Sequence, residues 1–307
     1  MSLIFEALQR SQGLHPDKDV WEATELLRDV ESRACLDESG KAYSPKETAT
    51  NRVIEDVQQE SDVKLNFLNA AVSVEPKISS ESHLVCFKND ESLAVENFRF
   101  LGVKLRHLRR ERPLKKLLIT STIPGEGKST VATNLAGVLA KRGQQKTLLL
   151  EGDVRRPSVF SMFGIDRHPG LCEWLEGRQR KAGNVYRIEG TDLWVLPAGK
   201  PSGNPTELLQ SPRLAILMEQ LSVIFDWIII DSPPVLPLAD TSVWMRMADG
   251  VLLVVRQGVT QKAELQRGID AIDSEKIIGT LLNASQESIH ASHYYYYKQD
   301  GVDDRAD

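Results

Sequence analysis

One short stretch of the chain carries residue types that bind phosphate groups. The segment "STIPGEGKST" (121–130) follows an apolar run and opens an amphipathic helix. Glycines let main-chain N–H groups close around phosphate oxygens, and a helix N-terminus adds partial positive charge. Lys128 is placed to reach the β- and γ-phosphates, and the Ser129 hydroxyl to ligate Mg²⁺. The segment predicts a phosphate-binding loop. The alternative is an ordinary helix start after a turn.

The loop departs from the strict pattern G-x-x-x-x-G-K-[ST] at one position. Thr122 stands where the first glycine is expected, whereas Gly125 and Gly127 are both present. The order of strand, turn and helix is the one that the pattern requires.

Acidic residues end two other apolar runs. The segment "LLLEGDVRRP" contains Glu151 and Asp153, whose i, i+2 spacing predicts that they point to the same side of a strand. Asp231 ends the run "FDWIIID". Ligands of open α/β sheets bind at the carboxyl ends of the strands, where all three acids fall. Together with the loop they predict a magnesium-nucleotide site. A single such acid is often only a helix cap.

The order of elements around these residues predicts an α/β fold. We expect strands at 114–121, 147–153, 193–199, 227–231, 251–258 and 277–283. We expect helices at 128–142, 205–225, 239–248 and 260–273. Strands that alternate with helices predict a mostly parallel sheet with helices on both faces.

Composition limits the class of protein. The chain has 307 residues, and its net charge of −5 argues against a nucleic-acid partner. Three widely spaced cysteines, Cys35, Cys86 and Cys172, fit a reducing cytosol better than a disulfide framework. The sequence contains no apolar run of the roughly 18 residues that would span a bilayer.

The chain divides into three parts by composition. Residues 1–90 form a polar arm with short helical segments near 3–8 and 20–34, and 35–80 read as a linker. The first helix fits a partner-docking role and simple packing equally well. Residues 91–283 form the P-loop domain and 284–307 a polar tail. The domain begins with a helix whose basic face has three readings, which are a solvated face, an intersubunit contact and a surface near anionic lipid.

Four adjacent tyrosines stand on the polar tail, namely Tyr294, Tyr295, Tyr296 and Tyr297. The run is either an aromatic packing patch or a set of phosphate acceptors. Eleven extended residues would reach roughly 35–40 Å, far enough to enter the active site of a neighbouring subunit.

With these motifs in place, the chain resembles the bacterial tyrosine kinases. The motifs are "STIPGEGKST", "LLLEGDVRRP", "WIIIDSPPVLPLAD" and the tyrosine cluster, over about 91–297. The resemblance implies ATP- and Mg²⁺-dependent autophosphorylation of the cluster and control of exopolysaccharide or capsule synthesis. The rival family is the septum-positioning and plasmid-partition ATPases, but their additional signature lysine is absent, since Ile123 occupies its position.

The resemblance also implies roles for individual residues. The catalytic residues would be Lys128, Glu151, Asp153 and Asp231. The nucleotide would be bound by Gly125, Glu126, Gly127, Lys128, Ser129, Thr130 and Asn283. The metal ligands would be Ser129, Asp153 and Asp231. The autophosphorylation sites would be Tyr294, Tyr295, Tyr296 and Tyr297. Glu151 stands where the family usually has an aspartate that activates the hydroxyl. Asn283 either contacts adenine or caps the last strand.

The resemblance implies partners as well. The family motif E-x-x-R-x-x-R, used in ring-like self-association, is represented by Glu96 and Arg99, with Gly102 in place of the second arginine. A separate transmembrane co-polymerase would activate the kinase at the inner face of the cell membrane. Polysaccharide-assembly enzymes would be further substrates. Two other functions stay open, which are an ATPase switch that controls assembly and a nucleotide-binding module with weak catalysis.

Overall fold

The computed structural model describes residues 71–284, with gaps at 89–91, 142–144, 167, 179–183, 202 and 237–239. These residues belong to one compact unit, Lys64–Asp307. Within the described part, no helix is long and apolar enough to cross a membrane.

Several expectations fall outside the described residues. They are the four tail tyrosines, the two helical segments of the arm and most of the expected linker, namely Tyr294, Tyr295, Tyr296, Tyr297, 3–8, 20–34 and 35–70. The roles expected of the tyrosines therefore stay predictions.

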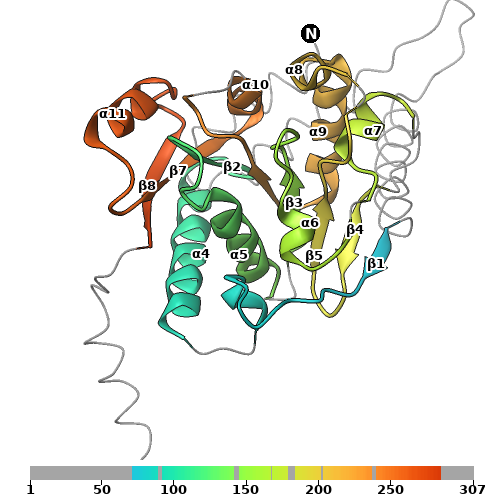
Figure 1. Ribbon diagram of the computed structural model, residues 1–307, viewed down its shortest axis with the longest axis horizontal. Coiled ribbons are helices and arrows are strands. Elements are labelled where there is room, and N and C mark those ends of the chain that lie inside the picture. The colour runs from blue at the N-terminus through green and yellow to red at the C-terminus, as the bar shows by residue number, and fades with distance from the viewer. Residues whose placement is uncertain are drawn as a thin grey trace, which may run out of the picture. The chain divides into compact units, whose positions relative to one another are not determined.

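Eight strands of the described residues form one sheet (Figure 1). They are β1 (Val72–Val74), β2 (Lys116–Ser121), β3 (Thr147–Glu151), β4 (Tyr186–Ile188), β5 (Leu193–Leu196), β6 (Trp227–Asp231), β7 (Gly250–Arg256) and β8 (Ile277–Asn283). The order is β1-β4-β5-β3-β6-β2-β7-β8. Every pair is parallel except β4 with β5. The predicted mostly parallel sheet is confirmed.

Helices cover both faces of this sheet. They are η1 (Val85–Phe87), α4 (Leu93–Glu111), α5 (Lys128–Ala140), α6 (Val159–Met162), α7 (Leu171–Leu175), α8 (Pro205–Leu209), α9 (Pro212–Ile224), α10 (Asp240–Met247) and α11 (Lys262–Asp270). Helices α4 and α5 lie side by side over one face with η1 and α6 (Figure 1). Helices α7, α9 and α10 pack on the other face.

The central strands are apolar on both sides because each face is covered. In β6, Ile229 packs toward α4 and α5, while Ile228 and Ile230 pack toward α9 and α10. All five residues of β6 are buried. This explains why the sequence shows unbroken apolar runs rather than an alternating pattern.

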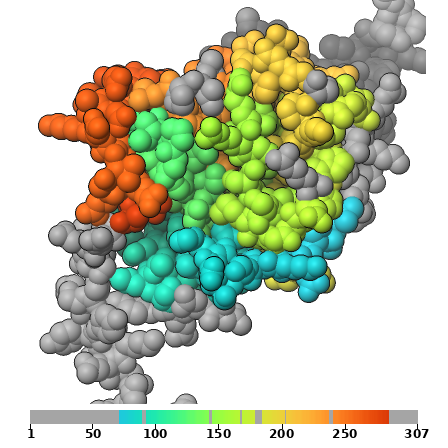
Figure 2. All heavy atoms as spheres, viewed as in Figure 1, coloured from blue at the N-terminus to red at the C-terminus, as the bar shows by residue number. Residues whose placement is uncertain are grey.

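Two expectations differ from the structure. The helix expected at 205–225 is divided into α8 and α9, because Pro212 opens a new helix and the Ser211 side chain accepts from the Arg213 N–H as its cap. Residues 71–88, which composition places in the polar arm, are part of the fold. Strand β1 pairs with β4, Leu84 and Cys86 are buried, and Figure 2 shows this segment in cyan on the surface beside α4.

Candidate active site

The phosphate-binding loop connects β2 to α5. Gly125 and Gly127 have φ values of 85° and 88°, a left-handed conformation that residues with a side chain rarely adopt. Gly127 is the N-cap of α5, so the loop leads directly into a helix N-terminus. The residues 122–129 therefore form the anion-binding geometry that the sequence predicts.

Thr122 is accommodated by a glycine on a neighbouring helix. Its side chain is fully buried and lies against Gly268 of α11, where an added Cβ would come within 2.9 Å of Thr122 Cγ2. The departure from the strict glycine pattern is therefore compatible with the loop, because the extra atoms pack against α11.

Four of the predicted residues converge at the start of α5. Lys128 Nζ lies 3.1 Å from Asp153 Oδ2, and both side chains are largely buried. Lys128 Nζ also lies 3.4 Å from Ser129 Oγ. The charge of Lys128 and the hydroxyl of Ser129 both lower the pKa of Asp231, the last residue of β6. A cation, a hydroxyl and two carboxylates thus share one corner of the sheet.

Asp231 is a fully buried acid whose two oxygens have no complete hydrogen bond among the described residues. The Ser129 hydroxyl interacts with it without reaching full hydrogen-bond geometry. Burial raises the pKa of Asp231 to about 7, although Lys128 works in the opposite direction. A buried carboxylate normally has a partner, so these unpaired oxygens fit a site for a cation.

The donor set also fits magnesium. No cluster of three or more His, Cys, Asp or Glu side chains that could hold a metal occurs among the described residues. Magnesium is usually bound by one or two carboxylates, with phosphate and water oxygens completing its octahedron. Asp231 and the Ser129 hydroxyl suit that requirement, and Asp153 lies next to them.

Glu151 is expected to activate the acceptor hydroxyl, and its carboxylate hydrogen-bonds to main-chain groups near the end of β3. Its side chain is 2% exposed, and its two oxygens accept three main-chain N–H groups. Oε1 accepts from Ser158 and from Val159 at 2.7 Å, and Oε2 accepts from Ala198 at 2.9 Å. Burial raises its pKa against the effect of these bonds. Glu151 thus joins β3 to α6 and to the loop after β5.

Glu126 is expected to contact the nucleotide, and Asn283 either to contact adenine or to cap the last strand; in the structure the side chains of both hydrogen-bond to the loop. The Glu126 side chain is fully buried and accepts from the Ile123 N–H at 2.7 Å. Asn283 Nδ2 donates to the main-chain oxygen of Glu126 at 2.9 Å. Two further residues on this side of the loop, Arg256 and Thr260, were missed. A charged residue at the end of a buried strand, as Arg256 is, was the available signal.

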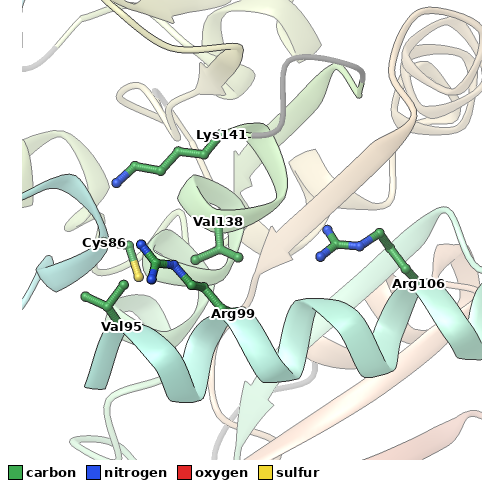
Figure 3. Close-up of a pocket in the computed structure, with 6 residues that line it drawn as sticks. All are labelled: Cys86, Val95, Arg99, Arg106, Val138 and Lys141. Atoms are coloured by element: carbon green, nitrogen blue, oxygen red, sulfur yellow. The ribbon is translucent and has the colours of Figure 1, made fainter. Parts of the chain in front are cut away.

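The helix α4 carries the residues expected in self-association. Glu96 and Arg99 form an exposed ion pair one turn apart. Gly102 is buried against α5, where an added Cβ would lie 3.2 Å from Val138 Cγ1. A cavity of about 150 Å³ lies between the two helices, and Figure 3 shows the Arg99 side chain ending next to Cys86, with the Lys141 side chain extending along the same cavity.

Several side chains of the basic run that begins in α4 contact other parts of the domain. Arg112 donates to the main-chain oxygen of Asp249. Lys115 Nζ donates to the main-chain oxygen of Ser222 at 2.7 Å, and Lys116 Nζ lies 3.8 Å from Asp249 Oδ1. The Arg109 guanidinium lies over the ring of Trp227. These contacts account for several of the basic residues without an external partner.

Comparison with known proteins decides the family. A family model described as an AAA domain matches residues 115–276. Tyrosine-protein kinase YwqD of Bacillus subtilis is 32% identical over 72% of this chain and 93% of its own length. Putative tyrosine-protein kinase CapB of Staphylococcus aureus is 30% identical over 73% of this chain and 99% of its own. The chain belongs to the bacterial tyrosine kinases.

Solved structures with the same fold include a tyrosine kinase domain. The chimerical protein CapA2B2 superposes with a TM-score of 0.64 and 30% identity, over 74% of this chain and all of that chain. The kinase domain of the Escherichia coli tyrosine kinase ETK gives a TM-score of 0.61 and 27% identity, over 67% and 82% of the two chains. This bacterial tyrosine kinase therefore has the P-loop fold that its sequence predicts.

Proposed function

We propose that this protein is an autokinase that transfers phosphate from ATP to four tyrosines of its own tail, Tyr294, Tyr295, Tyr296 and Tyr297. The observation that carries the proposal is the convergence of Lys128, Asp153 and Asp231 on the phosphate-binding loop. Phosphoryl transfer depends mainly on positioning and charge neutralisation, which this set of side chains supplies. The tyrosine cluster stands on the same chain, beyond the last strand.

Each residue of the site has a role in this reaction. The loop amides and Lys128 hold the phosphates, and Lys128 neutralises the charge that moves to the leaving oxygen. Asp231 and Ser129 would hold Mg²⁺, and Asp153 would support them. Magnesium, when bound, would neutralise negative charge on the phosphate groups. The ion pair with Asp153 holds the Lys128 ammonium group beside the loop.

The acceptor phenol must lose its proton as the phosphate arrives. A tyrosine hydroxyl is almost fully protonated at pH 7, so a carboxylate near the γ-phosphate is needed to accept the proton. Asp153 suits this role better than Glu151, because Asp153 accepts one main-chain N–H, from Arg156, beside its ion pair with Lys128, whereas the Glu151 oxygens accept three. Glu151 instead holds the end of β3 in place.

Self-association is a further part of the proposal. Outside the Glu96 and Arg99 pair, α4 exposes two large apolar side chains, Phe100 at 54% and Val103 at 47%. Such side chains on the outer face of a helix are typical of contact surfaces. A neighbouring copy bound there would bring one tail to another active site.

The biological setting is proposed from the relatives. One of them, at 32% identity, is named succinoglycan biosynthesis transport protein ExoP, and the matched region is a quarter of its length. We infer a role in exopolysaccharide or capsule synthesis and export. A transmembrane co-polymerase would activate the kinase at the inner face of the cell membrane, and polysaccharide-assembly enzymes would be additional substrates.

The test compares two products of ATP turnover. The purified protein is incubated with ATP and Mg²⁺, and ADP, free phosphate and phosphotyrosine are measured in the same samples. An autokinase forms phosphotyrosine in proportion to early ADP formation, and Asp231→Asn abolishes both. Free phosphate equal to ADP, with no phosphotyrosine, would instead show an ATPase switch.

A further inference from the structure

Side chains at the ends of β7 and β8 hydrogen-bond to the phosphate-binding loop. Arg256 and Asn283 are the last residues of these strands and are partners in the parallel register. Arg256 Nη1 donates to the main-chain oxygen of Gly125 at 3.1 Å. Asn283 Nδ2 donates to the main-chain oxygen of Glu126 at 2.9 Å. Two successive carbonyl groups of the loop are thus fixed by side chains from adjacent strands.

The Glu126 side chain completes this arrangement from within the loop. Its Oε2 accepts from the Ile123 N–H at 2.7 Å, which closes the turn. Its Oε1 accepts from the Arg256 N–H at 3.3 Å and from the Thr260 hydroxyl. Both oxygens of a fully buried carboxylate are therefore occupied by protein donors.

The Asn283 amide also packs closely against Gly127. A Cβ on Gly127 would lie 2.2 Å from Asn283 Nδ2. The amide therefore occupies the space that any side chain at residue 127 would need, at the point where α5 begins. A glycine is therefore required at residue 127 for two reasons, the close contact with Asn283 and the left-handed backbone conformation.

We propose that Glu126, Arg256, Thr260 and Asn283 form a brace, a set of positioning residues that holds the loop in its nucleotide-binding shape. This proposal shares one premise with the proposed function, which is that the loop binds the nucleotide. A flexible glycine loop must lose conformational freedom when phosphate binds. A loop ordered in advance avoids that cost, so the brace raises nucleotide affinity without touching the nucleotide.

The experiment removes one hydroxyl and then restores it. Thr260→Val deletes the hydroxyl at nearly constant shape, and Thr260→Ser keeps it. Thr280→Val makes the same change on an exposed position of β8 as a matched control. Affinity for a fluorescent ADP analogue and the melting temperature are measured for the full-length protein, and amide hydrogen exchange is followed across 123–129. Asn283→Ala and Glu126→Gln test the other contacts.

We expect Thr260→Val and Asn283→Ala to weaken ADP binding by roughly tenfold, the loss of one hydrogen bond to a charged or loop group. Exchange across 123–129 rises in these variants, while Thr260→Ser and Thr280→Val bind like the wild type. The KM for ATP rises more than kcat falls. Wild-type affinity in both variants would overturn the brace, as would equal loss in Thr260→Ser. Because ADP binding needs no phosphotransfer, absence of kinase activity leaves this test intact.

Discussion

Asp231 combines full burial with oxygens that lack a complete partner among the described residues. Proteins rarely keep such a group unless it serves a site. The nearby cation, Lys128, forms its short contact with Asp153 instead. At the scale of single residues, this unpaired acid is the feature that most directly indicates a magnesium position.

The pKa of Asp231 gives a pH prediction for the metal-free protein. Since burial raises this pKa from 3.8 to about 7, the folded state retains a proton that the unfolded state has lost between those values. Stability contributed by that proton is present at low pH and is lost as the pH rises toward 7, by about 1.4 kcal/mol per pH unit at most. We expect Asp231→Asn to be increasingly more stable than the wild type from pH 4 to 7, measured by urea unfolding with EDTA. A difference that stays constant over this range would contradict the assignment.

Glu151 gives a prediction about structure rather than proton transfer. Shortening it by one methylene in Glu151→Asp leaves at least one buried N–H of Ser158, Val159 or Ala198 without its acceptor. We expect the free energy of unfolding to fall by about 1–3 kcal/mol. Glu189→Asp, on an exposed turn, serves as the control. If Glu151→Asp unfolds like the wild type and restores faster phosphotyrosine formation, Glu151 occupies the position of a base and our reading is wrong.

At the scale of elements, the contact between α4 and α5 explains the incomplete self-association motif. Gly102 lies where α4 packs on α5, and a Cβ there would lie 3.2 Å from Val138 Cγ1 and 3.5 Å from Arg106 Nη2. An arginine would have to displace these neighbours. Glycine in place of the second motif arginine therefore allows α4 to pack on α5 as observed.

Restoring the motif arginine should therefore be harmful. We expect Gly102→Arg to lower the free energy of unfolding by about 1–3 kcal/mol, the usual cost of overpacking. Lys104→Arg, two residues along on the exposed side of the helix, should change it little. Thermal unfolding measures both. A Gly102→Arg protein that is as stable as the wild type and forms larger oligomers would show that α4 can shift to present the arginine.

The elements that the sequence predicts well are those with strong local patterns. The buried strands, the loop at 122–129 and the acids after β3 and β6 follow from short runs of residues. Short elements such as β1 and β4, with three residues each, carry too little pattern to detect. The brace could not be predicted, because Glu126 and Thr260 are 134 positions apart and meet only through the fold.

At the scale of the whole molecule, the account depends on how a tail reaches an active site. An extended tail of 11 residues spans roughly 35–40 Å, enough for a neighbouring copy. We expect transfer between copies. When Lys128→Met protein is mixed with a variant whose four tail tyrosines are phenylalanine, the Lys128→Met chains should gain phosphate, although neither protein does so alone. Absence of phosphate in the mixture, with an active wild type, would show that each chain modifies only its own tail.

The most direct test of the central claim is intact-mass spectrometry after incubation with ATP and Mg²⁺. The samples are the wild type, Lys128→Met and the variant with phenylalanine at 294–297, each with and without a candidate membrane-partner fragment. We expect phosphate additions to the wild type and none to either variant. Unmodified protein in every sample, with free phosphate released by the wild type but not by Lys128→Met, would contradict the kinase and leave an ATPase.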